Sequence, residues 1–296
     1  MMTSIVSFAL AYSLLAPLQS TPSSAPQGTG ARTRDVFVSV VDAKGAPVSG
    51  LAPADFVVKE DGVSREVLKV GPATAPMQIA LVVDDSQAST HAIQPLREGL
   101  TAFVETMAGK AEIGLITIGE RPTSLVQYTT DKAALQAGIG RIFARAGSGA
   151  YLTEGLLEVT KGLQKRNATR PVIVVITFPG TEFSNQQYQQ VLTPLLASGA
   201  TLHVIEVGMA PASNTDEMRN RNLLISEGTD QTGGRRDQLL ADTAIPERMK
   251  QVADELLSQY VVTYARPGTL IPPEKISVTV TRPGLTSRAR TRAAGK

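Results

Sequence analysis

The chain has 296 residues, enough for one large domain with a smaller one beside it. Hydrophobic residues make up 42% of the sequence, as in ordinary globular proteins, and a formal net charge of +2 gives no electrostatic reason to expect a nucleic-acid partner. The chain contains no cysteine, which excludes disulfides, thiolate metal sites and a cysteine nucleophile.

Residues 1–25 have the pattern of a signal peptide. Ile5 to Leu18 is an apolar run too short to span a bilayer comfortably, and residues rich in Thr, Ser, Pro and Gln follow it. Because no Lys or Arg precedes the run, an uncleaved membrane anchor is the alternative. No later stretch could cross a membrane, so we expect a periplasmic or extracellular protein in which residues 26–34 form a flexible leader.

Residues 35–76 are expected to form the N-terminal part of a small β subdomain. Val36, Val38 and Val40 alternate with polar residues, as on a half-buried strand, and Asp61-Gly62 is a hairpin signal between two further candidate strands. This segment is too short to build an independent core. A matching alternation at 276–280 indicates that residues 261–292 complete the subdomain from the other end of the chain.

The large domain is expected at residues 77–260. Ile79 to Val83 and Val172 to Thr177 are continuous apolar runs, which suit strands covered on both faces. Further strands are predicted at 113–118, 124–128 and 201–207. Two helices are predicted directly after Ser89 and Ser184, and others begin near residues 132, 153, 223 and 246. This alternation predicts an α/β fold with a doubly wound, mostly parallel sheet.

Asp84, Asp85 and Ser86 follow the first buried strand, at the edge where such sheets bind ligands. The run Asp84-Asp85-Ser86-Gln87-Ala88 resembles the Asp-x-Ser-x-Ser motif of von Willebrand factor type A (VWFA) domains, which have a Rossmann-like fold. The segments 48–62, 259–264 and 281–285 resemble the flanks of exported bacterial proteins related to that family. Together the resemblance covers residues 35–292.

The resemblance implies a metal-ion-dependent adhesion site (MIDAS) that binds a divalent cation, usually Mg²⁺. Ala88 replaces the last serine of the motif, Ala150 stands where a threonine is expected, and Pro179 stands where an aspartate is expected. Mg²⁺ requires several convergent oxygen ligands, so we expect a degenerate MIDAS without metal or cofactor. The alternative is a site rebuilt from neighbouring oxygens, drawn from Asp85, Ser89, Thr153, Glu154 and Glu182.

The sequence offers little for catalysis. A triad of Ser86, His91 and a nearby aspartate would crowd nucleophile and base onto one turn, and no nucleophile elbow or phosphate-binding loop is present. His203, within a predicted strand, is interpreted as a core or edge residue. We therefore expect a protein that is not an enzyme.

These observations predict an exported protein-binding module whose partner contacts the rim at the carboxyl ends of the strands. The candidate contact residues are Asp84, Asp85, Ser86, Ser89, Glu154 and Glu182. A metal-dependent adhesion domain and a purely structural cell-envelope subunit are the alternatives. The polar segment 208–222 is expected to be a mobile loop beside this rim. The basic C-terminal segment from Arg282 to Lys296 is interpreted as a charged edge strand or a surface for an anionic partner.

Overall fold

The apolar run after Pro76 forms β5 (Met77–Val83), a central strand of a six-stranded sheet. The computed structural model describes residues 31–209, 215–268 and 271–292. The strand order is β10-β9-β8-β5-β6-β7, and all neighbours are parallel except the pair β6 and β7. The other strands are β6 (Ala111–Thr117), β7 (Thr123–Thr129), β8 (Arg170–Thr177), β9 (Thr201–Val207) and β10 (Arg236–Leu239).

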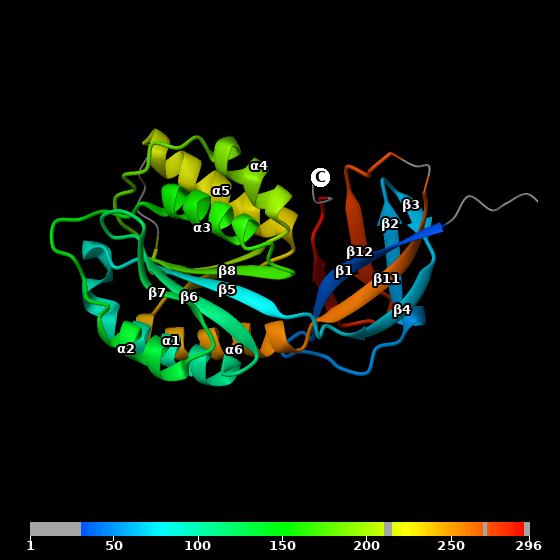
Figure 1. Cartoon of the computed structure of the whole chain (residues 1–296), viewed down its shortest axis with the longest axis horizontal. Helices are drawn as coiled ribbons and strands as arrows, with labels where there is room; N and C mark the ends of the chain where they lie inside the picture. Colours follow the sequence, from blue (N-terminus) through cyan, green and yellow to red (C-terminus); the bar gives the residue numbers. More distant parts are fainter. Residues whose placement is uncertain (1–30, 210–214, 269–270, 293–296) are drawn as a thin grey trace, which may run out of the picture.

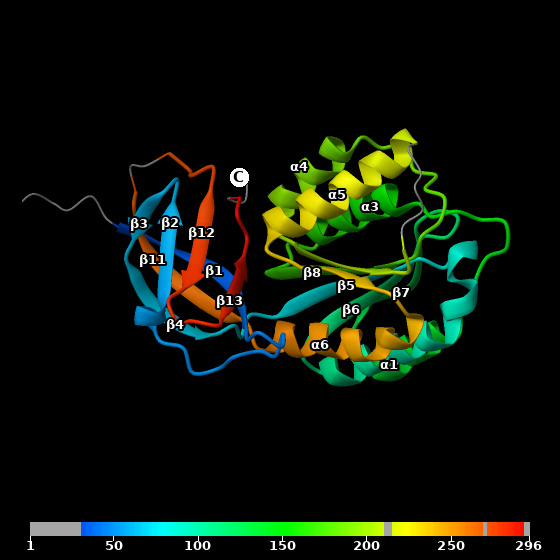
Figure 2. The ribbon, with the colours of Figure 1, turned by 180° about the vertical axis from the view of Figure 1, so that it is seen from behind.

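Helices cover both faces of this sheet, which confirms the predicted doubly wound architecture (Figures 1 and 2). One face packs against α1 (Ile93–Met107), α2 (Lys132–Gly140) and α6 (Ile245–Leu257). The other face packs against α3 (Leu152–Lys165), α4 (Tyr188–Ser198) and α5 (Asp216–Thr232). Every residue of β8 is buried, as its continuous apolar sequence predicts for a strand between two helical layers.

Both ends of the chain build a separate antiparallel β subdomain, which confirms that part of the predicted fold (Figure 1). Strand β1 lies between β11 and β13, and β2 pairs with both β3 and β12. Its apolar core joins strands from the two ends, so neither end could bury its side chains alone. The strands are β1 (Ala31–Val41), β2 (Phe56–Glu60), β3 (Val63–Arg65), β4 (Val67–Pro72), β11 (Tyr260–Pro267), β12 (Ile276–Val280) and β13 (Thr286–Ala289).

Besides strand β10, which was not predicted, the structure differs from the expectations in two segments. Residues 31–34 belong to β1 and pair with β11, so the second half of the expected leader is a strand. Helix α5 begins at Asp216, where a loop up to residue 222 was expected, because Met218 and Arg221 are buried on its inner face. The signal-peptide segment and residues 210–214 lie outside the described residues. Among the described residues, no helix is long and apolar enough to span a membrane.

Two chain crossings connect the β subdomain to the α/β domain, and Arg170 at the start of β8 binds both of them. Its guanidinium donates to the carbonyl oxygen of Ala73 at 3.0 Å, in the first crossing. In the second crossing it donates to the carbonyl oxygen of Leu256 at 2.6 Å and to Oε1 of Gln259 at 2.7 Å. Arg170 also lies over the Phe37 ring of β1, 5.2 Å from its centroid. One side chain therefore holds both connections in place.

A buried ionic cluster forms a second contact between the two units. Glu255 of α6 is paired with Arg288 of β13 at 2.5 Å and lies 3.9 Å from Arg235. His203 of β9 is fully enclosed beside this pair, and neither ring nitrogen has a hydrogen-bond partner in the described chain. Burial lowers the pKa of His203. Burial acts to raise the pKa of Glu255, but neighbouring positive charge outweighs burial and lowers that pKa. Arg288 is the main source of this positive charge, because His203 is kept neutral.

Candidate functional site at the carboxyl ends of the central strands

The loops that follow β5, β6, β8 and β10, together with Gly208 and Met209 after β9 and residues 141–151 before α3, form one rim of the sheet. This rim lies at the end of the molecule remote from the β subdomain (Figure 1). The candidate contact residues predicted from the sequence all lie on these loops or on the first turns that follow them. Their surroundings decide what the rim can do.

Asp84 directly follows β5, is fully buried, and has both carboxylate oxygens engaged by the protein. Its Oδ1 accepts a hydrogen bond from the backbone N–H of Ser86 at 3.0 Å. Its Oδ2 accepts from the hydroxyl of Thr177 at 3.0 Å and from the backbone N–H of Phe178 at 3.2 Å. Asp84 therefore ties the end of β5 to the end of β8, its neighbour in the sheet.

Asp85 is directed toward the other neighbouring strand, β6. Its Oδ1 accepts from the backbone N–H of Gly119 at 2.7 Å, and its Oδ2 pairs with Nε of Arg145 at 2.9 Å. The hydrogen bond to Asp85 raises the pKa of the Arg145 guanidinium. Residue 119 must be glycine for this approach, because a Cβ there would lie 2.7 Å from the carbonyl carbon of Asp85. Asp85 thus fastens the loop before α3 to the end of β6.

Ser86 and Ser89 are buried in the 3₁₀ turn (Gln87–Ala92) that leads from β5 to α1. The Ser89 hydroxyl donates to the carbonyl oxygen of Ser86 at 2.8 Å, so it stabilises the turn itself. The loop after β8 packs directly onto Ala88, since a Cβ on Gly180 would approach the Ala88 Cβ within 2.8 Å. Ala88 is therefore partly covered by this loop.

Glu182, on the loop after β8, directs its carboxylate at the start of α3. Its Oε1 accepts from the backbone N–H groups of Leu152 at 2.9 Å and Ser184 at 3.3 Å. A carboxylate at a helix N-terminus satisfies N–H groups that have no partner within the helix. Burial raises the pKa of Glu182. Glu154, in the first turn of the same helix, is only half-buried.

Five of the six candidate contact residues are therefore buried in this conformation, and Glu154 alone is accessible. The sequence predicted their position at the rim but could not predict that the carboxylates of Asp84, Asp85 and Glu182 would be used within the protein. The surface presented to a partner is consequently formed by the neighbours of these residues.

The side chains around Asp84 do not fit the divalent cation that the resemblance implies. Both oxygens of Asp84 are engaged, and Ala88 and Ala150 have no side-chain oxygen. Pro179 lies against Gly208, where a Cβ would be 3.0 Å from its ring. In the described part of the chain, no group of three or more acidic or histidine side chains could hold a metal ion.

Arg221 of α5 was not predicted to contribute to the rim. It is only 3% exposed, and its Nη2 donates to the Thr177 hydroxyl at 2.8 Å and to the Phe178 carbonyl oxygen at 3.1 Å. Its Nε and Nη1 have no hydrogen-bond partner in the described chain, and neither has Oε2 of Glu182. A single arginine within the polar run of residues 216–222 carries no sequence signal that would reveal this position.

Large apolar side chains are exposed along the rim. Met209 follows β9 and is 79% exposed, and Leu240 follows β10 and is 81% exposed. Phe183, on the loop after β8, is 44% exposed and packs beside Tyr151, and Phe143 on the loop before α3 is 59% exposed. The other exposed large apolar residues of the described chain lie on α5 and on the β subdomain. We call Phe143, Phe183, Met209 and Leu240 the apolar rim.

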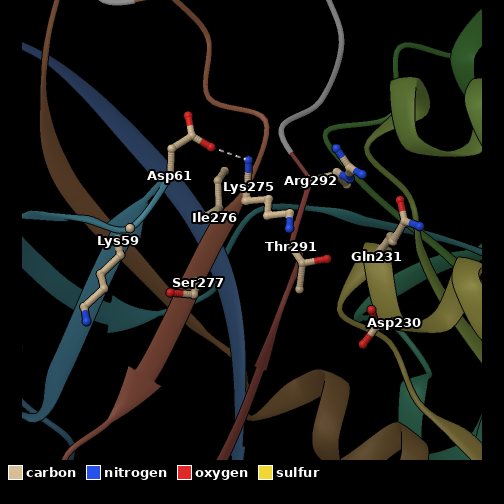
Figure 3. Close-up of a pocket in the computed structure, with 10 residues that line it drawn as sticks. Lys59, Asp61, Asp230, Gln231, Lys275, Ile276, Ser277, Thr291 and Arg292 are labelled. Carbon is tan, nitrogen blue, oxygen red and sulfur yellow. Dashed lines mark hydrogen bonds between the residues drawn. The ribbon is translucent and has the colours of Figure 1, made fainter.

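A pocket of about 440 Å³ lies elsewhere, between the β subdomain and the C-terminal end of α5 (Figure 3). Lys275, Thr291 and Arg292 face Asp230 and Gln231 across it. Ile276 is the only large apolar side chain among its described lining residues, whereas small-molecule sites are mostly apolar. It is therefore a weaker candidate for the functional site than the rim.

The basic C-terminal segment is largely used within the protein. Arg282 pairs with Asp55 at 2.7 Å, Arg288 pairs with Glu255, and Arg290 donates to the carbonyl oxygen of Leu196. Lys296 lies outside the described residues. Arg292 is the remaining described arginine of this segment, and it lines the pocket.

Residues 79–178, from β5 through β8 and including Asp84 and the loop before α3, match the model of the von Willebrand factor type A domain. The central domain is related to von Willebrand factor type A (VWFA) domains. The comparison with curated proteins finds no match.

Several solved structures share this fold at low sequence identity. A VWFA protein from Catenulispora acidiphila is 10% identical with a TM-score of 0.52, and the match covers 91% of this chain and 75% of that one. Proximal thread matrix protein 1 of the mussel byssus is 15% identical with a TM-score of 0.52, covering 67% of this chain. The chain matches about half, 50%, of the length of that mussel protein. Another structure of the mussel protein is described as having a zinc-occupied MIDAS motif (15% identity, TM-score 0.51, covering 67% of this chain and 49% of that one).

Proposed function

We propose that the protein is an exported, non-enzymatic protein-binding module whose VWFA domain contacts another protein through the apolar rim, without a metal ion. The observation that carries this proposal is the exposure of Phe143, Phe183, Met209 and Leu240 on neighbouring loops at one end of the sheet. Exposed aromatic and methionine side chains are enriched in protein interfaces. The apolar signal segment supports export.

The arrangement favours contacts made by side chains over a contact made through a bound cation. Phe183 lies on the loop that Glu182 fastens to α3, so the protein already holds it in position. A rigid aromatic anchor loses little conformational entropy when it is buried by a partner. Glu154 can supply a polar contact beside it.

Photocrosslinking tests this proposal directly. A benzoylphenylalanine at position 183 is expected to form an adduct with a protein of the producing cell's envelope or medium, in chelator as well as in Mg²⁺. The same group at Val63, which is also exposed but lies on the β subdomain, is the matched control and should form no such adduct. The double variant Phe183→Ser, Leu240→Ser should lose the partner, because truncating central apolar anchors costs at least about 2 kcal/mol each.

The outcomes separate the alternatives. An adduct that disappears in chelator would instead support a metal-dependent adhesion domain. Equal labelling from positions 183 and 63, with no effect of the double variant, would support a structural subunit and contradict a binding rim.

Metal independence gives a separate prediction for thermal stability. At millimolar Mg²⁺ a site of micromolar affinity would stabilise the folded protein by roughly 4 kcal/mol, a clear shift of the melting temperature. We expect no difference between chelator and millimolar Mg²⁺ or Mn²⁺, since both Asp84 oxygens already accept hydrogen bonds. A metal-dependent shift that Asp84→Ala abolishes would contradict the proposal.

A further inference from the structure

The rim buries more negative charge than its visible ion pairs neutralise. Asp84, Asp85 and Glu182 are all at most 3% exposed. Asp85 pairs with Arg145, but among the described residues neither Asp84 nor Glu182 has a cation within ion-pair distance. An ionised carboxylate removed from water costs several kcal/mol unless charge and hydrogen bonds compensate it. Backbone N–H groups supply part of that compensation, and a nearby positive charge would add to it.

Arg221 is placed to supply this charge. Of the arginines that the structure describes as buried, Arg170 and Arg266 contact the β subdomain, and Arg221 alone lies at the rim. Its guanidinium reaches Asp84 through one intermediate, because the Thr177 hydroxyl accepts from Arg221 and donates to Asp84. It also holds the Phe178 carbonyl oxygen, while the N–H of the same residue donates to Asp84.

The same guanidinium acts on Glu182. Its positive charge lowers the pKa of that carboxyl, against the larger effect of burial. Arg221 therefore influences both buried carboxylates that lack an ion pair, Asp84 through the Thr177 hydroxyl and Glu182 through its charge. Two of its nitrogen atoms have no hydrogen-bond partner in the described chain, so no other carboxylate there neutralises the guanidinium at these atoms.

We propose that the Arg221 guanidinium is the resident cation of the rim, supplying the positive charge that a divalent ion would supply and holding the loops after β5 and β8 together. A fixed cation at this position repels an incoming metal ion and leaves the rim assembled at all times. The VWFA domain would then present its surface constitutively, with no control by the metal-ion concentration. This inference concerns the folded domain and holds whether or not the rim binds a protein.

A double-mutant cycle measured at two pH values tests the proposal. Arg221→Met keeps an unbranched apolar stem and removes the charge, and Glu182→Gln removes the carboxylate that this charge compensates. At pH 8 we expect Arg221→Met to raise the unfolding equilibrium constant about 100-fold, as when one partner of a buried charge pair is removed. At pH 5 the effect should be about tenfold smaller, because Glu182 can then be protonated in the variant. In the Glu182→Gln background the two pH values should give the same effect.

The pKa of Glu182 explains why the Arg221→Met variant should be less stable at high pH than at low pH. Without Arg221 the pKa of Glu182 rises further above its ordinary value of 4.5, so ionising it destabilises the folded variant at high pH, and stability recovers at low pH. Arg221→Lys keeps the charge and should show the pH dependence of the wild type. Arg219→Met, an exposed arginine on the same helix, is the matched control and should change the equilibrium constant less than about threefold.

A loss of stability that is equal at pH 5 and pH 8, or unchanged in the Glu182→Gln background, would show that Arg221 only fills space and would overturn the proposal. If Arg221→Met does not fold at pH 8, folding of the double variant with Glu182→Gln at that pH supports the proposal. Failure of that double variant to fold as well overturns it.

Discussion

Replacing Arg170 by methionine is expected to uncouple the β subdomain from the VWFA domain and to cost about 3–5 kcal/mol of unfolding free energy. The variant loses the three acceptors in the two crossings and the contact with Phe37. Burial lowers the pKa of Arg170 to about 10, so it is still charged at neutral pH and its hydrogen bonds are charge-assisted. In the variant the carbonyl oxygens of Ala73 and Leu256 would be left without this donor.

Urea unfolding followed by both circular dichroism and limited proteolysis of β1 measures the effect. We expect a lower midpoint and earlier cleavage within β1, because Gln259, which Arg170 binds, also donates to Ser39 of β1 at 2.9 Å. Arg219→Met serves here too as the control, since that arginine is exposed and its ion pair with Asp216 contributes little. A wild-type midpoint with unchanged protection of β1 would show that the two units are held together by other contacts.

Periodicity and apolar runs were sufficient to predict most elements of the fold. The continuous apolar runs of β5 and β8 predicted buried parallel strands, and the alternation around Val36 and Val278 predicted the subdomain built from both ends. Helix α5 was predicted seven residues too short at its N-terminus, because the run 216–222 is mostly polar and its buried residues, Met218 and Arg221, do not form an apolar pattern. Strand β10 was missed for a similar reason, since its four residues carry two charges.

The candidate site was predicted only in part. The motif placed Asp84 and Asp85 correctly after β5, because that position depends on local sequence. Their burial depends on donors from distant segments, namely Thr177, Gly119 and Arg145. Arg170 and Arg221 could not be found at all, since an isolated arginine in a sequence is normally a surface residue. Long-range polar contacts have no period, and so the chemistry of the rim became visible only in the folded chain.

Acidification is expected to destabilise the protein through His203, which adjoins the second contact between the two units. The imidazole is enclosed by β9 and faces Glu255 of α6, Arg288 of β13, and Arg235 and Asp237 at β10. Burial lowers its pKa, so the folded protein keeps His203 neutral at pH values where a histidine of the unfolded chain, with a pKa of 6.5, is protonated. The unfolded state then binds the additional proton, and stability falls as the pH decreases below 6.5.

The expected slope is at most about 1.4 kcal/mol per pH unit for one proton, so the loss between about pH 6.5 and pH 5 reaches about 2 kcal/mol. Glu182 contributes with the opposite sign, because its raised pKa makes acidification favour the folded state. The contribution of His203 is therefore the difference between the pH profiles of the wild type and His203→Leu, measured by urea unfolding at each pH. The variant should lose the decline below pH 6.5, and His91→Leu, at an exposed position, should keep it. Parallel profiles for the wild type and His203→Leu would mean that the folded protein accepts a proton at this site, and that Glu255 stabilises the imidazolium more than burial disfavours it.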